Sequence, residues 1–204
     1  MSSTATVVAP PRTEAIVDQH GLVTRARDGD RHAFAELARA SGARLDATAR
    51  LILRDPDLAQ DAVQETLIRA WRGLPGLRDP AAFDHWLHTL VAHSCLELIR
   101  RRRRRVVEVE LTPIHDPITQ DPTIQVSERD LLDRLLARLD PETRAVVVLH
   151  LYLDHPLPRV ATMLGIPTGT AKSRLHRALG AMRSGMAVDE VVAATSSAYG
   201  RPTP

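Results

Sequence analysis

Aromatic residues, cysteine and lysine are all scarce in this 204-residue chain. Aromatic residues make up only 3% of the sequence although 44% of it is hydrophobic, so the core has to be built from Leu, Val, Ala and Ile. Such residues at helical spacing favour small helical bundles. The single cysteine, Cys95, excludes an internal disulfide and fits a reducing cytosol. Lys172 is the only lysine among 27 basic residues.

Long apolar runs and a secretory leader are missing as well. No apolar run approaches the roughly 18 residues that a membrane-spanning helix needs. The first residues do not form a basic-then-apolar leader. We therefore expect a soluble, cytoplasmic protein that does not insert into membranes.

The positive charge is concentrated in one place. The net charge is only +2 at pH 7, yet Arg100 to Arg105 are six consecutive arginines, so the rest of the chain is net negative. A uniformly basic surface for nucleic acid is thereby excluded, and any such binding has to work through local patches.

The hydrophobic pattern predicts an all-α fold with two small helical domains joined by a flexible linker. Residues 1–17 are small, polar and proline-bearing, which predicts a disordered tail. We expect a helical domain over 18–105, a linker over 106–127, where the periodicity vanishes, and a second helical domain over 128–186. Residues 187–204 are expected to form a C-terminal tail.

Acidic capping residues mark several helix starts. Asp30 precedes one apolar-periodic run, and Asp55 and Asp140 each precede a proline, which suits a first helical position. The helix after Asp55 is expected to face inward with Leu58, Ala62, Val63, Leu67, Ala70, Trp71 and Leu74. A loop broken by glycine and proline follows over 73–84. The next helix is expected to bury Phe83, Trp86, Leu87, Leu90, Val91, Cys95, Leu98 and Ile99.

A pair of helices with a tight turn is predicted over Leu157 to Arg183. A short helix begins near Pro158, Gly165 provides a left-handed cap, and Thr168 is expected to cap a longer helix over 169–183. Apolar residues at helical spacing give the two helices a common core.

The outward face of the longer helix is rich in hydroxyl and cationic side chains. It carries Thr170, Lys172, Ser173, Arg174 and Arg177, and no acidic residue occurs between residues 154 and 189. A helix with one apolar face and one cationic, acid-free face suits reading of the DNA major groove. The alternative, from spacing alone, is a small helical pair with a solvated basic face.

The arginine run extends a helix whose other face is expected to be buried, so its charges are held in place. Fixed guanidinium groups can fork phosphate oxygens, and the release of counterions then favours binding. Beside Trp86 and the proline-broken loop, the run predicts a site for DNA backbone with unstacked bases. An isolated basic run can equally be a solvated charge cluster.

Acidic and amide side chains gather at the start of the helix that follows Asp55. Asp57, Asp61, Gln64 and Glu65 lie there. By themselves they are typical of residues that compensate the helix dipole.

Three segments of the chain resemble regions of the sigma factors of the sigma-70 family, and specifically of the small extracytoplasmic-function (ECF) group. Residues 165–178 read GIPTGTAKSRLHRA and closely resemble the end of region 4. Residues 61–71 (DAVQETLIRAW) resemble region 2.2, and residues 83–101 (FDHWLHTLVAHSCLELIRR) resemble regions 2.3 and 2.4. The chain departs from the family pattern at Ala92-His93, at Glu97 and over 156–159.

This resemblance implies a non-enzymatic protein without cofactors or metals. It implies core RNA polymerase and promoter DNA as partners, and it allows an anti-sigma factor as a third partner. It assigns polymerase binding to Asp61, Gln64, Glu65 and Arg69. It assigns the minus-ten element to Trp86, His93, Arg100, Arg101, Arg102, Arg103 and Arg104. It assigns the upstream minus-thirty-five element to Thr168, Thr170, Lys172, Ser173, Arg174 and Arg177.

The residues alone also allow other functions to be considered. A stand-alone helix–turn–helix regulator would bind an operator without polymerase, usually as a dimer, and would leave the surface of 61–71 without a role. A metal-dependent helical enzyme would use His85, His88 and His93 near Cys95, but the chain has no second cysteine and no HExxH string. A Ser/His/Asp hydrolase is disfavoured because the G-x-S-x-G elbow is missing.

Overall fold

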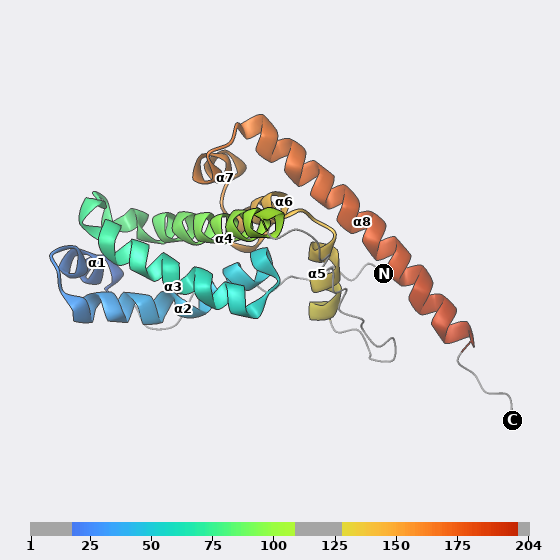
Figure 1. Cartoon of the computed structure of the whole chain (residues 1–204), viewed down its shortest axis with the longest axis horizontal. Coiled ribbons are helices and arrows are strands. Elements are labelled where there is room, and N and C mark those ends of the chain that lie inside the picture. Colours follow the sequence, from blue (N-terminus) through green and yellow to red (C-terminus); the bar gives the residue numbers. More distant parts are fainter. Residues whose placement is uncertain (1–17, 109–127, 200–204) are drawn as a thin grey trace, which may run out of the picture.

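The computed structural model describes residues 18–108 and 128–199, with side chains over 18–104 and 131–186, and all regular structure in these ranges is helical. The first four α-helices are α1 (Gln19–Arg27), α2 (Arg31–Leu53), α3 (Pro56–Gly73) and α4 (Phe83–Glu108). The second four are α5 (Glu128–Ala137), α6 (Pro141–Val147), α7 (Leu157–Leu164) and α8 (Thr168–Tyr199), as Figure 1 shows. The expected all-α fold is thereby confirmed. The N-terminal tail and residues 109–127 of the predicted linker lie outside the described residues.

The predicted helix starts are confirmed by capping hydrogen bonds. The Asp30 carboxylate accepts two backbone N–H bonds, of 2.9 and 3.1 Å. The Asp55 carboxylate accepts two bonds of 3.1 Å, and the Asp140 carboxylate accepts one of 2.9 Å. Each of these carboxylates satisfies N–H groups that have no partner within the helix, and its charge complements the helix dipole.

Three helix ends differ from the expected ones. α4 continues to Glu108, three residues into the predicted linker. α8 begins at Thr168, which is therefore its first residue instead of the cap before it, because helical hydrogen bonding already starts at the Pro167 carbonyl. α8 also continues to Tyr199, past the expected end near residue 183, since no proline interrupts it. Neither α8 nor any other described helix combines the length and apolarity needed to cross a membrane.

The core of α1 to α4 depends on small side chains from α3. Ala59, Ala62 and Ala70 are completely buried, whereas Leu67 and Trp71, which we expected to face inward, are only half-buried. Small residues allow α2 and α4 to approach α3 closely, and the larger side chains then fill the flanks of the same contact.

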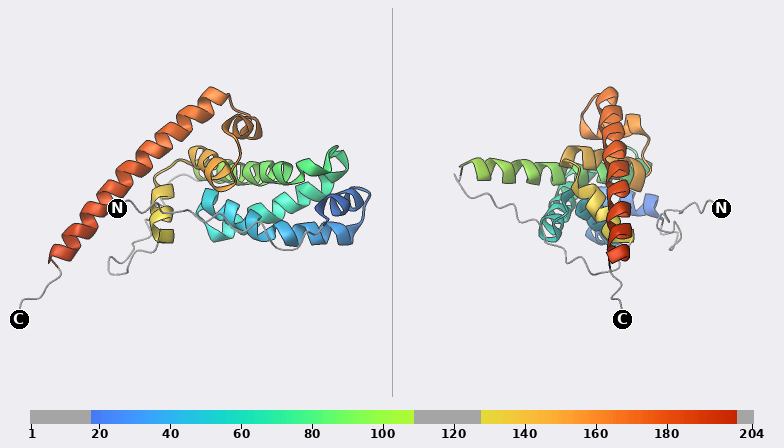
Figure 2. Two further views of the ribbon diagram at one scale, coloured as in Figure 1. Left: turned by 180° about the vertical axis from the view of Figure 1, so that it is seen from behind. Right: turned by 90° about the vertical axis from the view of Figure 1, so that its right-hand side faces the viewer.

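Helix α4 is buried on two sides. Its expected inward side, which includes Phe83, Val91 and Cys95, packs against α2 and α3. Burial raises the pKa of the Cys95 thiol to about 12. An adjoining side is covered as well, because Ala92 is buried in a cluster with Val146, Leu149, Val160 and Met163 of the second half. Figure 2 shows α6 and α7 on α4, and its second view shows the C-terminal end of α4 projecting beyond the rest of the described chain.

Arg144 joins α6 to the first four helices. Its side chain is buried, and its Nη1 donates to the carbonyl of Ile52, near the C-terminal end of α2, at 2.8 Å. Its Nη2 donates to the carbonyl of Leu139 at 2.8 Å. The pKa of Arg144 is lowered to about 10, first by burial and then by the charge of Arg54, and Asp140 partly offsets both effects. The guanidinium thus satisfies a carbonyl near a helix C-terminus, where a cation also complements the dipole.

We expect Arg144→Ala to lower the free energy of unfolding by about 2–4 kcal/mol, because two buried carbonyls lose their charged donor. Arg144→Lys should recover less than half of the loss, since an ammonium cannot fork two carbonyls as a guanidinium does. Urea unfolding followed by circular dichroism measures both variants. Arg39→Ala, an exposed change on α2, is the control and should cost less than about 0.5 kcal/mol. A loss for Arg144→Ala as small as that of the control would contradict the bridging role.

Candidate functional site

An open hollow of about 330 Å³ lies between α3 and α4. Its lining combines acidic, basic and apolar side chains: Asp61, Gln64, Glu65, Ile68, Arg69, Ser94, Glu97, Leu98 and Arg101. The four residues that the sequence assigned to polymerase binding are thus gathered around one concave surface. Five further residues, four of them from α4, complete it.

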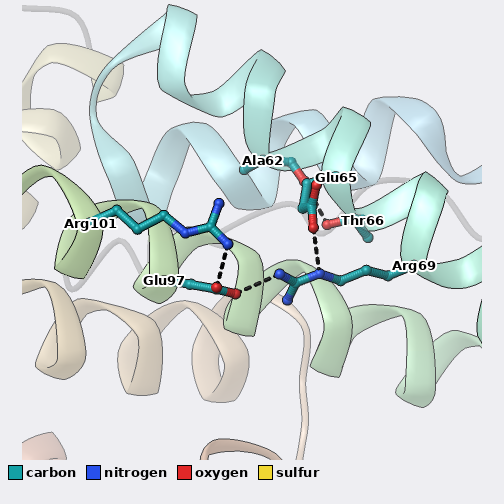
Figure 3. Close-up of polar contacts among 6 residues, drawn as sticks. All are labelled: Ala62, Glu65, Thr66, Arg69, Glu97 and Arg101. Carbon is teal, nitrogen blue, oxygen red and sulfur yellow. Dashed lines mark hydrogen bonds and ion pairs between the residues drawn. The ribbon is translucent and has the colours of Figure 1, made fainter.

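A chain of ion pairs crosses the hollow, as Figure 3 shows. Arg69 Nε lies 2.8 Å from Glu65 Oε1, and Arg69 Nη2 lies 2.5 Å from Glu97 Oε2. Arg101 Nη2 lies 2.5 Å from the other oxygen of Glu97. The hydrogen bonds from Arg69 and then from Arg101 lower the pKa of Glu97, and the bond to Glu97 raises the pKa of Arg69. The alternation of charges fixes the side chains of both helices relative to one another.

The ion pairs leave an uneven distribution of charge on this surface. Arg69 is held by Glu65 and Glu97, so it does not present a free cation to a partner. Asp61 and Gln64 are exposed and form no hydrogen bond or ion pair with another described residue. Asp61 is therefore the acidic group on this surface that is open to an incoming cation.

Ile68 is a residue of the hollow that sequence reasoning missed. Its side chain is 40% exposed, although large apolar side chains are normally covered in a monomer. Its position, seven residues after Asp61 and three after Glu65, places it on the same face of α3 as the predicted polar residues. An apolar residue at that spacing within a polar helix face is the signal that could have identified it.

The arginine tract at the end of α4 is only partly free. Arg101 pairs with Glu97, and Arg102 Nη1 lies 3.1 Å from Asp55 Oδ2, at the start of α3. The other tract residues with described side chains, Arg100, Arg103 and Arg104, are exposed and form no ion pair with a described residue. Their charges are therefore not neutralised by Glu97 and Asp55, the acidic residues that pair with Arg101 and Arg102.

Trp86 and His93 lie on the same face of α4 as part of the tract. Residues seven apart along a helix nearly eclipse one another, so Trp86, His93 and Arg100 form one stripe. The Trp86 ring is half-buried and packs over the end of α3, where a Cβ on Gly73 would approach it to 3.1 Å. Phe83 supports the indole, with ring centroids 6.1 Å apart. His93 is exposed.

Helices α7 and α8 form the expected tight pair. Gly165 has φ 64°, the left-handed conformation predicted for the residue that ends α7. Ala161, Ala171 and Ala178 are buried between the helices and their neighbours. On the outward side, exposed side chains belong to Thr168, Lys172, Ser173 and Arg177, while Thr170 is half-buried.

Arg174 differs from its neighbours on the outward face of α8. We expected it to be exposed, but its side chain is half-buried and lies near the N-terminal end of α6. The pKa of Asp140 is lowered there. Burial opposes this shift, hydrogen bonds from Thr143 cause most of it, and the charge of Arg174 adds to it. The charge of Arg174 therefore acts on a protein carboxylate outside its own helix.

The histidines considered for a metal site are not gathered around Cys95. His93 is exposed, Cys95 is in the core, and His85 and His88 face the second half of the chain. Across residues 18–104 and 131–186, no group of three or more His, Cys, Asp or Glu side chains is arranged to hold a metal ion.

Solved structures share this fold. A structure of CnrH in complex with the cytosolic domain of CnrY has a TM-score of 0.60 and 24% identity, and the match covers 84% of this chain and 98% of that chain. The sigma factor RpoE, in a co-crystal structure with the anti-sigma factor NepR from Bartonella quintana, has a TM-score of 0.63 and 24% identity. That match covers 76% of this chain and 98% of that chain.

Sequence comparisons identify the family. The Sigma-70 region 2 family matches residues 37–105, and the Sigma-70, region 4 family matches residues 129–182. The ECF RNA polymerase sigma factor SigM of Mycobacterium tuberculosis is 38% identical over 152 residues, which cover 74% of this chain and 75% of that protein. The RNA polymerase sigma-E factor of Streptomyces avermitilis is 35% identical over 150 residues, covering 74% and 83%. The chain therefore belongs to the sigma-70 family of RNA polymerase sigma factors, in its extracytoplasmic-function group.

Proposed function

We propose that this ECF sigma factor binds core RNA polymerase through the hollow between α3 and α4 and positions promoter DNA with α4 and α8. The polymerase supplies the chemistry of transcription, and no residue of this chain acts as a catalyst. We place this activity in the cytoplasm, where polymerase and DNA meet. The hollow carries the proposal, because Asp61, Gln64, Glu65 and Arg69 line it together.

The composition of the hollow fits a protein partner that is basic and partly apolar. An apolar centre within a polar rim is typical of residues that contribute most to protein binding. Ile68 supplies that centre, and the ion pairs of Glu65, Arg69 and Glu97 keep the rim in one arrangement before binding. Asp61 then pairs with a cation of the polymerase.

The projecting end of α4 fits melted DNA near the minus-ten element. The exposed arginines Arg100, Arg103 and Arg104 bind phosphate, while Arg101 and Arg102 order the tract through their ion pairs with Glu97 and Asp55. Trp86 and His93, on the stripe that leads to the tract, are available to stack on or contact unpaired bases.

The start of α8 fits the major groove of the upstream minus-thirty-five element. Thr168, Lys172, Ser173 and Arg177 are exposed there, and Thr170 and Arg174 lie at the edge of the surface. Because a groove-reading helix has to present its polar face without acidic groups, the acid-free stretch of α8 supports this role.

The roles divide between two domains. We assign polymerase and minus-ten binding to 18–105 and upstream-element binding to 128–186, with 106–127 as the linker and 1–17 and 187–204 as tails. The two structural neighbours were solved with the cytosolic domain of CnrY and with the anti-sigma factor NepR. We propose an anti-sigma factor as a third partner of this chain.

Polymerase docking should depend on Asp61 and Glu65. We expect the double variant Asp61→Arg/Glu65→Arg to bind core polymerase at least 30-fold more weakly, about 2 kcal/mol, because it places two cations where a basic partner binds. Titration of core polymerase with labelled protein measures the affinity, and run-off transcription measures the consequence.

Glu36→Arg makes the same charge reversal at an exposed position on α2 and serves as the control. It should leave affinity and transcription close to those of the parent, and circular dichroism should show equal helix content in all variants. Full-strength binding by the double variant would contradict this docking surface. Specific operator binding without polymerase, unaffected by the double variant, would instead favour the stand-alone regulator.

The free arginines of the tract should act on phosphate and not on sequence. We expect Arg103→Gln/Arg104→Gln to weaken holoenzyme binding to different promoters by similar factors. The slope of log affinity against log salt concentration should become less steep by about two, because two phosphate contacts are lost. Filter binding at salt concentrations between about 50 and 200 mM measures this slope. An unchanged slope would mean that these side chains are only solvated.

Arg174 should contribute to promoter discrimination. We expect Arg174→Ala to reduce transcription from a cognate promoter about ten-fold at limiting holoenzyme, since a guanidinium paired with a guanine edge is worth about 1–3 kcal/mol. Core polymerase binding should not change. Arg183→Ala, an exposed arginine further along α8, is the control. If Arg174→Ala retains full discrimination at every upstream base pair, the half-buried guanidinium serves Asp140 and not the DNA.

A further inference from the structure

Three histidine rings from the two halves of the chain meet between α4 and α7. His85 and His88 lie one turn apart on α4, and His155 lies just before α7. His88 Nδ1 is 3.0 Å from His155 Nε2, and the ring centroids of His88 and His155 are 5.1 Å apart. The His85 ring centroid is 4.8 Å from that of His155. His88 and His155 are buried, with 6% and 3% of their surfaces exposed.

The backbone that precedes α7 is shaped to bring His155 onto α4. A single π-helical turn over 148–152 ends α6, and Asp154 then adopts a left-handed conformation with φ 55°. Aspartate tolerates this conformation better than most residues, and π-turns are frequent at functional positions. His150 Nδ1 lies 2.8 Å from the carbonyl oxygen of His155, and this contact orients the peptide group that follows His155.

The geometry of the cluster suits neutral imidazoles. A hydrogen bond between two ring nitrogens needs one N–H donor and one bare acceptor, so both rings cannot be protonated and keep it. Two imidazolium cations with nitrogens 3.0 Å apart would also repel each other in a region without solvent. His85 Nδ1 is buried and has no hydrogen-bond partner among the described residues.

Burial is the largest influence on the pKa of His88 and of His155. The pKa of His88 is lowered to about 4, first by burial and then by the charges of His155, Arg44 and His85, while Asp84 opposes them. Burial also lowers the pKa of His155, where the charges of His85 and Arg159 add to the effect and those of Asp154 and Asp84 oppose it. Two carboxylates and two guanidinium groups thus face the cluster, on α2, α4, α7 and the segment before α7.

The cluster lies in the interface between the two halves of the chain, and other contacts also join the halves there. Ala92, one turn beyond His88 on α4, is buried with apolar residues of α6 and α7. The second link is Arg144, whose hydrogen bond to Ile52 crosses between α6 and α2. The histidines are therefore the titratable residues of this interface, because the apolar residues around Ala92 and the Arg144 guanidinium do not change charge near neutral pH.

We propose that His85, His88 and His155 form a proton-sensitive latch, which holds the two halves of the chain together when neutral and releases them when protonated. The latch concerns the packing of the halves on each other, and it does not depend on which partner either half binds.

The direction of the pH effect follows from the proton count of the two forms. An exposed histidine titrates near 6.5, whereas closure holds the pKa of His88 near 4. The open form therefore binds more protons between these pH values, and the closed form loses stability as the pH falls through them. At pH 5.0, His88 alone should shift the ratio of closed to open form by about 30-fold, that is, ten-fold for each pH unit below 6.5.

Energy transfer between two dyes, one on each half, tests the latch in the full chain. Cysteines at the exposed positions Ala40→Cys on α2 and Ser184→Cys on α8, in a Cys95→Ala background, carry the dyes. We expect the transfer efficiency to fall as the pH is lowered from about 7.5 to 5.0, while helix content stays constant. The same titration in an Arg144→Lys background, where closure is weaker, should show the fall at higher pH.

The matched control is His88→Asn/His155→Gln, which places amide groups where the two bonded ring nitrogens lie and removes their titration. This variant should stay closed over the whole pH range, whereas His155→Lys should be open at pH 7.5 with helix content intact. Constant transfer in both the parent and the Arg144→Lys background overturns the proposal. So does an equal fall in the Asn/Gln variant, or a fall that only accompanies loss of helix.

Discussion

Helix α4 is packed by α2 and α3 on one side and by α6 and α7 on the other, and the remaining features of the molecule depend on this double burial. It fixes the direction in which the C-terminal end of α4, with its arginines, leaves the bundle. It fixes Glu97 opposite Arg69, so that the hollow on α3 and α4 has a single arrangement. It also brings His88 against His155, 67 residues away in sequence. A helix with only one buried face could not have coupled these sites.

Part of the formal charge on the candidate surfaces is balanced within the chain. Arg69 and Arg101 meet Glu97, and Arg102 meets Asp55, so only some members of each charged group face solvent unpaired. Exposed ion pairs of this kind contribute little to stability. They affect the shape of each surface and the sign of its charge, because they order long side chains and determine which charges a polymerase or a DNA backbone encounters. A small net charge of +2 is therefore compatible with surfaces of opposite sign on one molecule.

Features that depend on neighbouring residues in sequence could be predicted, and features that depend on distant contacts could not. The caps Asp30 and Asp55 and the left-handed Gly165 follow from local backbone chemistry, and they occur as expected. The exposure of Arg174 was expected from helix spacing alone, which takes no account of the packing of α6 on α8. Ile68 and Ser94 line the hollow only because α3 and α4 pack at one particular register. Likewise, the second buried face of α4 carries histidine and alanine, whose weak hydrophobic signal does not reveal a covering domain.

The burial of Cys95 has a consequence for how the molecule responds to oxidants. Thiols react as thiolates, and a thiol with a pKa of about 12 in the core has almost none at physiological pH. Since Cys95 is the single cysteine of the sequence, the folded chain does not cross-link to itself through sulfur when the redox poise of its surroundings changes. Among the described methionines, Met186 on α8 is the most exposed, at 43%, so its sulfur is the one most open to an oxidant. Oxidation there would turn an apolar surface residue into a polar sulfoxide, a change that reductases can reverse.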